Sequence, residues 1–206
     1  MSTWSVTVSD PLNEGVLVTV VNGVRDVVGS QQVAIRGFDP PIVTPPGSSR
    51  VLNLYCRQDM LEVPARGIVQ FSVDGTAVFW GPAVVVPPSG TRGAGPFDED
   101  RDAIERVTVV GGEQLLRDSG VGALLVEGVV DVASIAFQFC SMYAHPALTV
   151  TEGNFVTTGA VLDVFYKPES TLYDALQTLV DSVPGGAVAW VDADGAVRFE
   201  VLSAAS

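Results

Sequence analysis

Charged residues are scarce in this chain of 206 residues. They make up 17% of it, against about 25% in average soluble domains. The balance among them is acidic, with 11 lysines and arginines against 24 aspartates and glutamates and a formal net charge of −13. Nucleic-acid binding and docking on an anionic membrane both need clustered basic side chains, and the sequence has no run of them. The composition therefore argues against both functions.

Cysteine and histidine are too few for the usual metal sites. Cys56 and Cys140 lie far apart and neither belongs to a C-x-x-C pair, so no zinc site is predicted. We interpret them as two buried thiols, with one disulfide between them as the alternative. His145 is the single histidine, and the sequence has no G-x-S-x-G motif for a catalytic serine. A structural or surface role is predicted for it.

Leader, membrane-span and phosphate-binding signals are also missing. The first residues lack the basic and apolar regions of a secretion signal. Glu127 and Asp131 interrupt the most apolar stretch, 121–144, which argues against a bilayer span. The glycine pairs at 111–112 and 185–186 fit neither common phosphate-loop motif. We expect a soluble protein made in a cytoplasm, with no cofactor.

Acidic residues gather at two places that calcium could use. Asp192-x-Asp194-Gly195 resembles the opening of a calcium loop, but the closing acid would fall on Ser203, so a hairpin turn is predicted. The other group lacks calcium-loop spacing and is interpreted as a solvated loop, with calcium binding left open. This group comprises Asp98, Glu99, Asp100, Asp102 and Glu105.

Two further functions, sugar binding and glycoside hydrolysis, have only weak support in the sequence. Trp80 and Trp190 lie on predicted strands and could stack sugar rings, although tryptophans in sheets are more often buried. A carboxylate pair for glycoside hydrolysis is conceivable among 24 acids, but nothing selects one. No catalytic, cofactor-binding or metal residue is therefore assigned, and the chain is not expected to be an enzyme.

Abundant valine in alternating patterns predicts a mainly β protein. Asn22-Gly23 and Asp74-Gly75 each follow one alternating run and precede another, which is a strong hairpin signal. Further strands are expected at 4–8, 27–35, 51–55 and 106–110, and exposed loop is expected at 38–49 and 87–102.

The second half mixes helix and strand. A short helix is predicted at 113–118, and a longer one begins at Thr171, where Asp174 completes a loose capping box. Strands are expected at 160–166 and in a hairpin at 187–202. Residues 121–150 fit either short strands or part helix, with 143–150 extended. We expect a barrel-like or sandwich-like domain at 1–118 and a small α+β module at 119–206.

Two segments resemble a known family. The hairpin V-Q-F-S-V-D-G-T-A-V-F-W-G at 69–81, followed by R-V-T-V-V-G at 106–111 and Leu115-Leu116, resembles the β-barrel of tailed-phage tail-tip and baseplate-hub proteins. The helix T-L-Y-D-A-L at 171–176 and the hairpin W-V-D-A-D-G-A-V-R-F at 190–199 are similar to the module that often follows that barrel. The order and spacing of the segments fit the family better than either segment alone.

The resemblance implies a non-enzymatic virion protein at the tail tip. Such subunits assemble as closed trimeric or hexameric rings and join the tail tube to distal tail, tip and fibre proteins. Low charge suits a subunit covered by neighbours. An acidic lumen would let genome DNA pass without binding it. Whether the chain is the hub, a distal tail ring or another minor tail protein stays open, and a carbohydrate-binding module using exposed tryptophan is the alternative function.

The resemblance and the patterns together give architectural candidates. The proline-rich loops at 38–49 and 87–100 are candidate docking segments, because proline reduces the flexibility lost on binding. Core residues are predicted for both parts. For the barrel these are Phe71, Val73, Phe79 and Trp80, and for the second module Leu172, Leu176, Leu179, Trp190 and Phe199.

Overall fold

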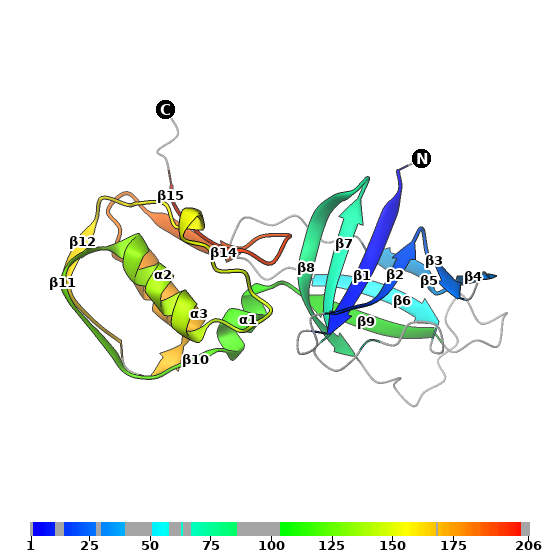
Figure 1. Ribbon diagram of the computed structural model, residues 1–206, viewed down its shortest axis with the longest axis horizontal. Helices are drawn as coiled ribbons and strands as arrows, with labels where there is room; N and C mark the ends of the chain where they lie inside the picture. Colours follow the sequence, from blue (N-terminus) through cyan, green and yellow to red (C-terminus); the bar gives the residue numbers. More distant parts are fainter. Residues whose placement is uncertain are drawn as a thin grey trace. The chain divides into compact units, whose positions relative to one another are not determined.

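The computed structural model describes residues 2–10, 15–27, 30–39, 51–57, 63, 67–85, 104–167 and 169–202 (Figure 1). Within these ranges the chain divides into two compact units, the first ending at Gly111 and the second starting at Gly112. The short helix at 113–118 falls in the second unit, where its Leu115 carbonyl accepts a hydrogen bond from Ser119. The boundary between the units thus comes one short helix earlier than the sequence-based division after residue 118.

The first unit is a single curled sheet, so the mainly β fold expected from the sequence is confirmed. Its strands follow the order β4-β3-β2-β1-β7-β8-β9-β6-β5, and every pair is antiparallel. The strands are β1 (Trp4–Asp10), β2 (Gly15–Val21), β3 (Val24–Val27), β4 (Ser30–Val33), β5 (Ile35–Asp39), β6 (Val51–Arg57), β7 (Ile68–Val73), β8 (Thr76–Val85) and β9 (Ile104–Val110).

Two tight turns confirm the predicted hairpins. Asn22 and Gly23 have φ values of 48° and 81°, and Asp74 and Gly75 have 48° and 79°. Positive φ at both central residues defines the type I′ turn, whose twist matches that of antiparallel strands. Asparagine, aspartate and glycine are the residues that tolerate this geometry.

A pair of backbone hydrogen bonds curls the sheet. The carbonyl oxygen of Gly23 accepts from the backbone N–H groups of Ala34 and Ile35, at 2.8 and 3.1 Å. This brings the start of β5 against the β2–β3 turn. A Cβ atom at position 23 would collide with the Ile35 carbonyl oxygen, so glycine is required here for space as well as for its positive φ.

The concave side of the sheet is filled by aliphatic and aromatic residues. Phe71 and Phe79 are 2% and 1% exposed, as predicted, and Val73 packs partly buried against the same core. At one margin of the core, the Trp4, Phe38 and Phe71 rings form a cluster with centroids 4.9 to 6.1 Å apart. Edge-on and tilted ring pairs at these distances add to the burial energy.

Two predictions about the first unit are wrong. Trp80 does not belong to the core cluster and is only half-buried, because neighbours on a strand face opposite sides and Phe79 takes the inward position. Phe38 and Asp39 were expected in a loop, but they end β5, and Phe38 packs in the aromatic cluster. Residues 40–49 and 87–102 lie outside the described residues.

The second unit combines three α-helices with three small antiparallel sheets in the part of the chain described. The sheets pair β10 with β13, β11 with β12, and β14 with β15. No helix among the described residues has the length and apolar character needed to cross a bilayer. The elements are α1 (Glu113–Asp118), β10 (Gly120–Val121), β11 (Leu124–Asp131), α2 (Val132–Tyr143), the 3-10 turn η1 (Glu152–Asn154), β12 (Val161–Lys167), β13 (Ser170–Thr171), α3 (Leu172–Asp181), β14 (Ala187–Val191) and β15 (Val197–Val201).

The helices α1 and α3 match their sequence patterns. Leu115 and Leu116 of α1 are buried, as expected. In α3, Thr171 is the N-cap, accepting from the Asp174 N–H at 3.1 Å and donating its hydroxyl to the Asp174 carboxylate at 2.7 Å. An N-cap of this kind typically contributes about 1 kcal/mol. The predicted core residues of this unit are confirmed except Trp190, which is half-buried: Leu172, Leu176, Leu179 and Phe199 are at most 1% exposed.

The ambiguous stretch 121–150 contains a strand followed directly by a helix. β11 pairs with β12, and α2 begins at the next residue. The expected extended segment at 143–150 is wrong at its start, because Tyr143 ends α2, and turns follow it. The helix α2 buries Ile135, Ala136, Phe139 and Cys140.

Candidate functional site

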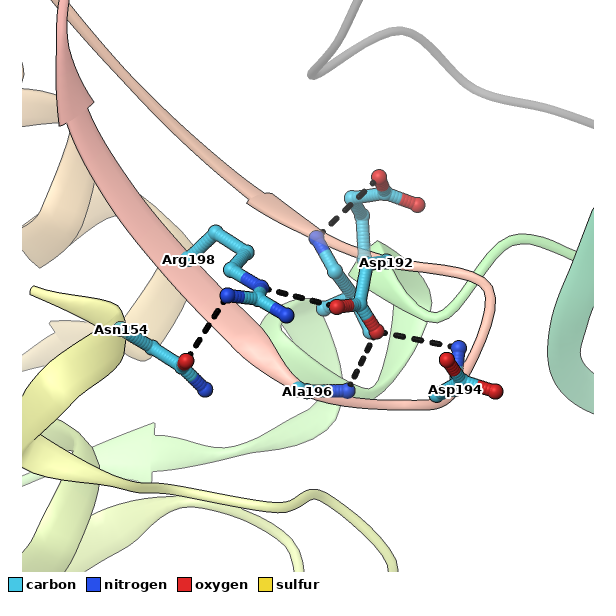
Figure 2. Close-up of polar contacts among 7 residues, drawn as sticks. Asn154, Asp192, Asp194, Ala196 and Arg198 are labelled. Carbon is cyan, nitrogen blue, oxygen red and sulfur yellow. Dashed lines mark hydrogen bonds and ion pairs between the residues drawn. The ribbon is translucent and has the colours of Figure 1, made fainter.

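A polar network surrounds the β14–β15 turn (Figure 2). One oxygen of the Asp192 carboxylate accepts from the backbone N–H groups of Asp194 and Ala196, at 3.0 and 2.9 Å. A short polar side chain that accepts from the backbone two residues on forms an Asx turn. Gly195 completes it with a φ of 79°. The hairpin-turn interpretation of Asp192-x-Asp194-Gly195 is therefore confirmed.

Arg198 connects this turn to a segment far away in sequence. Its Nε donates to the second oxygen of Asp192 at 2.8 Å, and its Nη1 donates to the side-chain carbonyl of Asn154 at 2.8 Å. Figure 2 shows the guanidinium lying between these two partners. Asn154 ends η1, so the network ties η1 to the hairpin and holds both against one another. Sequence reasoning missed Asn154, because nothing local links it to Arg198.

Backbone bonds reinforce the same junction. Val197 donates to Thr149, and Val156 donates to Phe199, at 3.0 and 2.9 Å. Thr149 and Phe155, on either side of η1, therefore each form an isolated parallel bridge, with Ala196 and Phe199 respectively. The network is a structural lock: both Asp192 oxygens already accept strong hydrogen bonds, including a charge-assisted one.

Calcium binding gains no support from the described residues. No group of three or more histidine, cysteine, aspartate or glutamate side chains lies close enough there to hold a metal ion. The acidic cluster at 98–102 lies outside the described residues, and Glu105 lies on β9 with its side chain undescribed. Calcium binding by that cluster stays a prediction without a structural test.

Asp131 forms a second lock that the sequence did not reveal. It ends β11 and is the N-cap of α2, accepting from the Ala133 N–H at 2.8 Å. The same carboxylate accepts from the Gly159 N–H at 2.9 Å and from the Thr158 hydroxyl at 3.2 Å. One side chain thereby fixes the strand-to-helix junction and the loop before β12. Its position directly before an apolar helix was the available signal.

His145 and the cysteines have structural positions. The Nδ1 atom of His145 accepts from the Ala147 N–H at 3.1 Å in the turn after α2, a contact that fits the predicted structural or surface role. Cys56 and Cys140 form no disulfide and each is buried in its own unit, so the two-thiol interpretation is confirmed and the disulfide alternative is wrong. Burial raises the pKa of the Cys140 thiol to about 12, because the apolar surroundings disfavour the thiolate.

Polar side chains on β5, β6 and β9 of the first unit hydrogen-bond across neighbouring strands. The Tyr55 hydroxyl donates to Asp39 at 2.9 Å, joining β6 to β5, and Thr108 donates to Asn53 at 3.0 Å, joining β9 to β6. The hydrogen bond to Asp39 raises the pKa of Tyr55, since it stabilises the protonated phenol. These contacts cross-link neighbouring strands.

The two tryptophans proposed for sugar stacking are both half-buried. Trp80 pairs with Gln70 across β7 and β8, and Trp190 pairs with Arg198 across β14 and β15. Neither position decides between packing and ligand binding. The carbohydrate alternative therefore stays an untested prediction.

Comparisons of sequence identify no relative. The chain matches no protein-family model, and no curated protein is similar to it in sequence. Any similarity to known proteins therefore has to be sought in the fold.

Solved structures do resemble the chain. The tail protein from Neisseria meningitidis MC58 is 17% identical, with 95% of this chain and 50% of that chain covered and a TM-score of 0.48. The 43 kDa tail protein of prophage MuSo2 from Shewanella oneidensis is 11% identical, with 98% and 55% covered and a TM-score of 0.56. The chain thus spans about half the length of each. Across nearly all of its length, this chain has the fold of the 43 kDa tail protein of prophage MuSo2.

Proposed function

We propose that the chain is a structural virion protein of a tailed phage or related particle. In this proposal it is a subunit of the tail tip or baseplate hub that joins the tail tube to distal components by ring assembly. The observation that supports it most is the fold shared with the 43 kDa prophage tail protein over 98% of this chain. The hub-like segments at 69–81 and 171–199 lie in that fold as one strand hairpin, one helix and a second hairpin.

The polar chemistry of the described residues supports a non-enzymatic role. Asp131, His145, Thr171 and Asp192 each cap a turn or a helix end through hydrogen bonds of 2.8 to 3.1 Å. A catalytic acid or nucleophile needs instead to face a substrate site beside a base or a charged partner. These side chains hold elements together, which is the task of a scaffold subunit.

The acidic balance supports a place beside the path of the genome. A net charge of −13 repels a DNA backbone, and a conduit needs a surface that does not hold DNA. The subunit would sit in the tail of the virion, in contact with its own copies and with tube, distal-tail and tip proteins.

Location in the particle is the direct test. Purified virions are analysed by mass spectrometry, and an antibody against this chain is placed on them by electron microscopy. Label at the distal end of the tail supports the proposal, and absence of the chain from purified virions refutes it. Light scattering of the purified protein, alone and mixed with neighbouring gene products, then measures the predicted ring or complex.

A glycan array tests the alternative function. If the isolated chain binds a glycan and Trp80→Ala or Trp190→Ala abolishes that binding, carbohydrate recognition replaces the scaffold role. If nothing binds, the alternative is dropped.

A further inference from the structure

The β2–β3 turn joins separate parts of the first sheet through one pair of residues. Asn22 donates its backbone N–H to the Trp4 carbonyl oxygen at 2.8 Å, and its side-chain oxygen accepts from the Trp4 N–H at 3.0 Å. The Gly23 carbonyl oxygen accepts from the N–H groups of Ala34 and Ile35, where β5 begins. The pair therefore holds the start of β1 on one side and the curl of the sheet on the other.

The same pair is the reactive dipeptide of the chain. Asparagine deamidates fastest when glycine follows it, because glycine does not shield its own backbone nitrogen. Asn22-Gly23 is the single such dipeptide in the sequence, since Asn13, Asn53 and Asn154 precede larger residues. Asn22 is also exposed to solvent, and asparagine is among the thermolabile residues. A change at this position would act on the turn that organises the sheet.

Deamidation proceeds through a five-membered ring. The Gly23 nitrogen loses its proton to solvent base and attacks the side-chain carbon Cγ of Asn22. The bond from Cγ to the amide nitrogen breaks, and ammonia leaves. One water molecule then opens the cyclic imide at either carbonyl carbon, and nothing is oxidised or reduced. Opening at Cγ leaves an aspartate, whereas opening at the main-chain carbonyl leaves an isoaspartate, whose Cβ and Cγ belong to the backbone.

The native turn keeps the reacting atoms apart. Ring closure needs the Gly23 nitrogen and the Asn22 Cβ on the same side of the bond between Cα and the main-chain carbonyl carbon. The first central residue of a type I′ turn has a ψ of about +30°, which places them on opposite sides. The hydrogen bond from Trp4 also holds the side-chain oxygen in place. Because this reaction requires close and aligned atoms, the folded turn is protected.

Release of the turn therefore has to precede the reaction. The Asn22 side chain rotates toward Gly23 only after it leaves the Trp4 N–H. Rotation of the main chain at Asn22 also displaces the Gly23 carbonyl from Ala34 and Ile35. Local openings of this kind occur without unfolding of the whole unit.

The other type I′ turn indicates which product the sheet accepts. Asp74 donates its N–H to the Thr3 carbonyl at 2.6 Å and accepts from the Thr3 N–H at 2.7 Å. These are the same two contacts that Asn22 makes to Trp4. An aspartate at position 22 would keep both contacts, since a carboxylate oxygen accepts as an amide oxygen does. An isoaspartate would not, because the added backbone atom breaks the two-residue geometry of the turn.

We propose that Asn22 is a deamidation site that reacts when the start of β1 is released, and that its isoaspartyl product prevents the turn from closing again. The turn is then a one-way device, in which a reversible opening becomes permanent. This inference goes beyond the virion role and does not depend on it.

The first test compares rates in the folded and the unfolded chain. Peptide mass spectrometry of the full chain, incubated in mildly alkaline buffer, measures the conversion of each asparagine. In urea that unfolds the chain, Asn22 is expected to react faster than Asn13, Asn53 and Asn154. In native buffer its rate should fall about tenfold or more, because only the open population reacts. Equal rates in the two conditions, or a faster asparagine elsewhere in urea, overturn the inference.

Two substitutions at one position isolate the hydrogen bond to Asn22. Trp4→Pro and Trp4→Ala both remove the indole ring, but only proline removes the N–H that Asn22 accepts. Proline is tolerated at the first residue of a strand, and Trp4 begins β1. We expect Asn22 to deamidate about two- to tenfold faster in Trp4→Pro, as the loss of one hydrogen bond predicts. Equal rates in the two variants refute the protective role of this bond.

A fallback covers failure of the proline variant to fold, which circular dichroism melting detects. The wild-type rate at Asn22 is then measured at urea concentrations below the unfolding midpoint. A rate that rises before global unfolding supports local release of the turn, and a rate that follows global unfolding alone refutes it.

The product is tested separately. Chains deamidated in urea are returned to native buffer, their isoaspartate is quantified with isoaspartyl methyltransferase, and their melting is followed by circular dichroism. Isoaspartyl chains are expected to melt below the wild type. Asn22→Asp, treated in parallel as the control without an amide to lose, is expected to melt with it. Isoaspartyl chains that melt like the wild type refute the one-way step. The virion-location test involves neither Asn22 nor Trp4, so the proposed function stands or fails independently.

Discussion

Gly81 offers the sharpest stability prediction. It lies on β8 directly after Trp80, at the aromatic-glycine end of the hub-like hairpin. Its φ is not in the left-handed region, so conformational freedom does not explain the glycine. A Cβ atom there would overlap the Val110 carbonyl oxygen and crowd the backbone at Gly111. Glycine is therefore required at this position because the end of β9 leaves no room for a side chain.

The cost of Gly81→Ala follows from what the new methyl group meets. Overpacking a core typically costs about 1–3 kcal/mol, and more when the neighbour cannot move. The obstacle here is the backbone at the end of a paired strand, which cannot rotate away as a side chain does. We expect a loss of about 3 kcal/mol or more in the free energy of unfolding.

Gly37→Ala is the matched control. Gly37 lies on β5 of the same sheet, with a φ outside the left-handed region, and a methyl group added there would meet no atom within 4 Å. Alanine there should change stability by less than about 1 kcal/mol, since it mainly reduces the freedom of the unfolded chain. Urea unfolding is followed by the fluorescence of Trp4 and Trp80, in a Trp190→Phe background. Equal unfolding midpoints for the two variants would refute the steric argument.

Three further outcomes are expected. Leu176→Ala should lower the free energy of unfolding, measured by urea titration, by about 2–5 kcal/mol. Leu125→Ala, at a position that is 53% exposed, should lower it far less. Similar losses for the two variants would contradict the burial of Leu176 in the core. Asp192→Ala removes the carboxylate that accepts from the turn backbone and from Arg198, and should lower the free energy of unfolding by about 1–3 kcal/mol. Asp192→Asn should lower it less, because one acceptor oxygen remains. An unchanged melting temperature for Asp192→Ala would contradict the structural role of this network. The Cys140 thiol, with its pKa raised to about 12, should resist alkylation in the native protein at pH 8 and react once the protein is unfolded, which peptide mass spectrometry measures. Because the thiol of the unfolded chain ionises at lower pH, the contribution of Cys140 to stability is full below about pH 8.5 and is lost as the pH rises from there toward 12.

Local signals predicted the elements that depend on neighbours in sequence. Asn22-Gly23 and Asp74-Gly75 require positive φ, and both form the expected hairpin turns. The Thr171 cap and the leucines of α3 follow helical spacing, and the structure shows both. Such features are decided within a few residues, so a single sequence carries them.

Burial on a particular face could not be predicted in the same way. Phe79 and Trp80 are adjacent and both apolar, so the sequence alone does not say which faces inward. The stretch 121–150 was ambiguous because an apolar strand, β11, runs directly into an apolar helix, α2, and Asp131 marks the junction only once Thr158 and Gly159 are seen to bind it. A partner distant in sequence resolved each case.

The sequence by itself determined the mainly β composition, the turns, the cap of α3 and the scarcity of charge, because these depend on residue type and local spacing. Only the tertiary structure decided that β1 lies between β2 and β7 and that Arg198 joins Asn154 to Asp192. Pairing between distant strands depends on which surfaces meet when the chain collapses. That choice is a property of the whole packed unit and of no single segment.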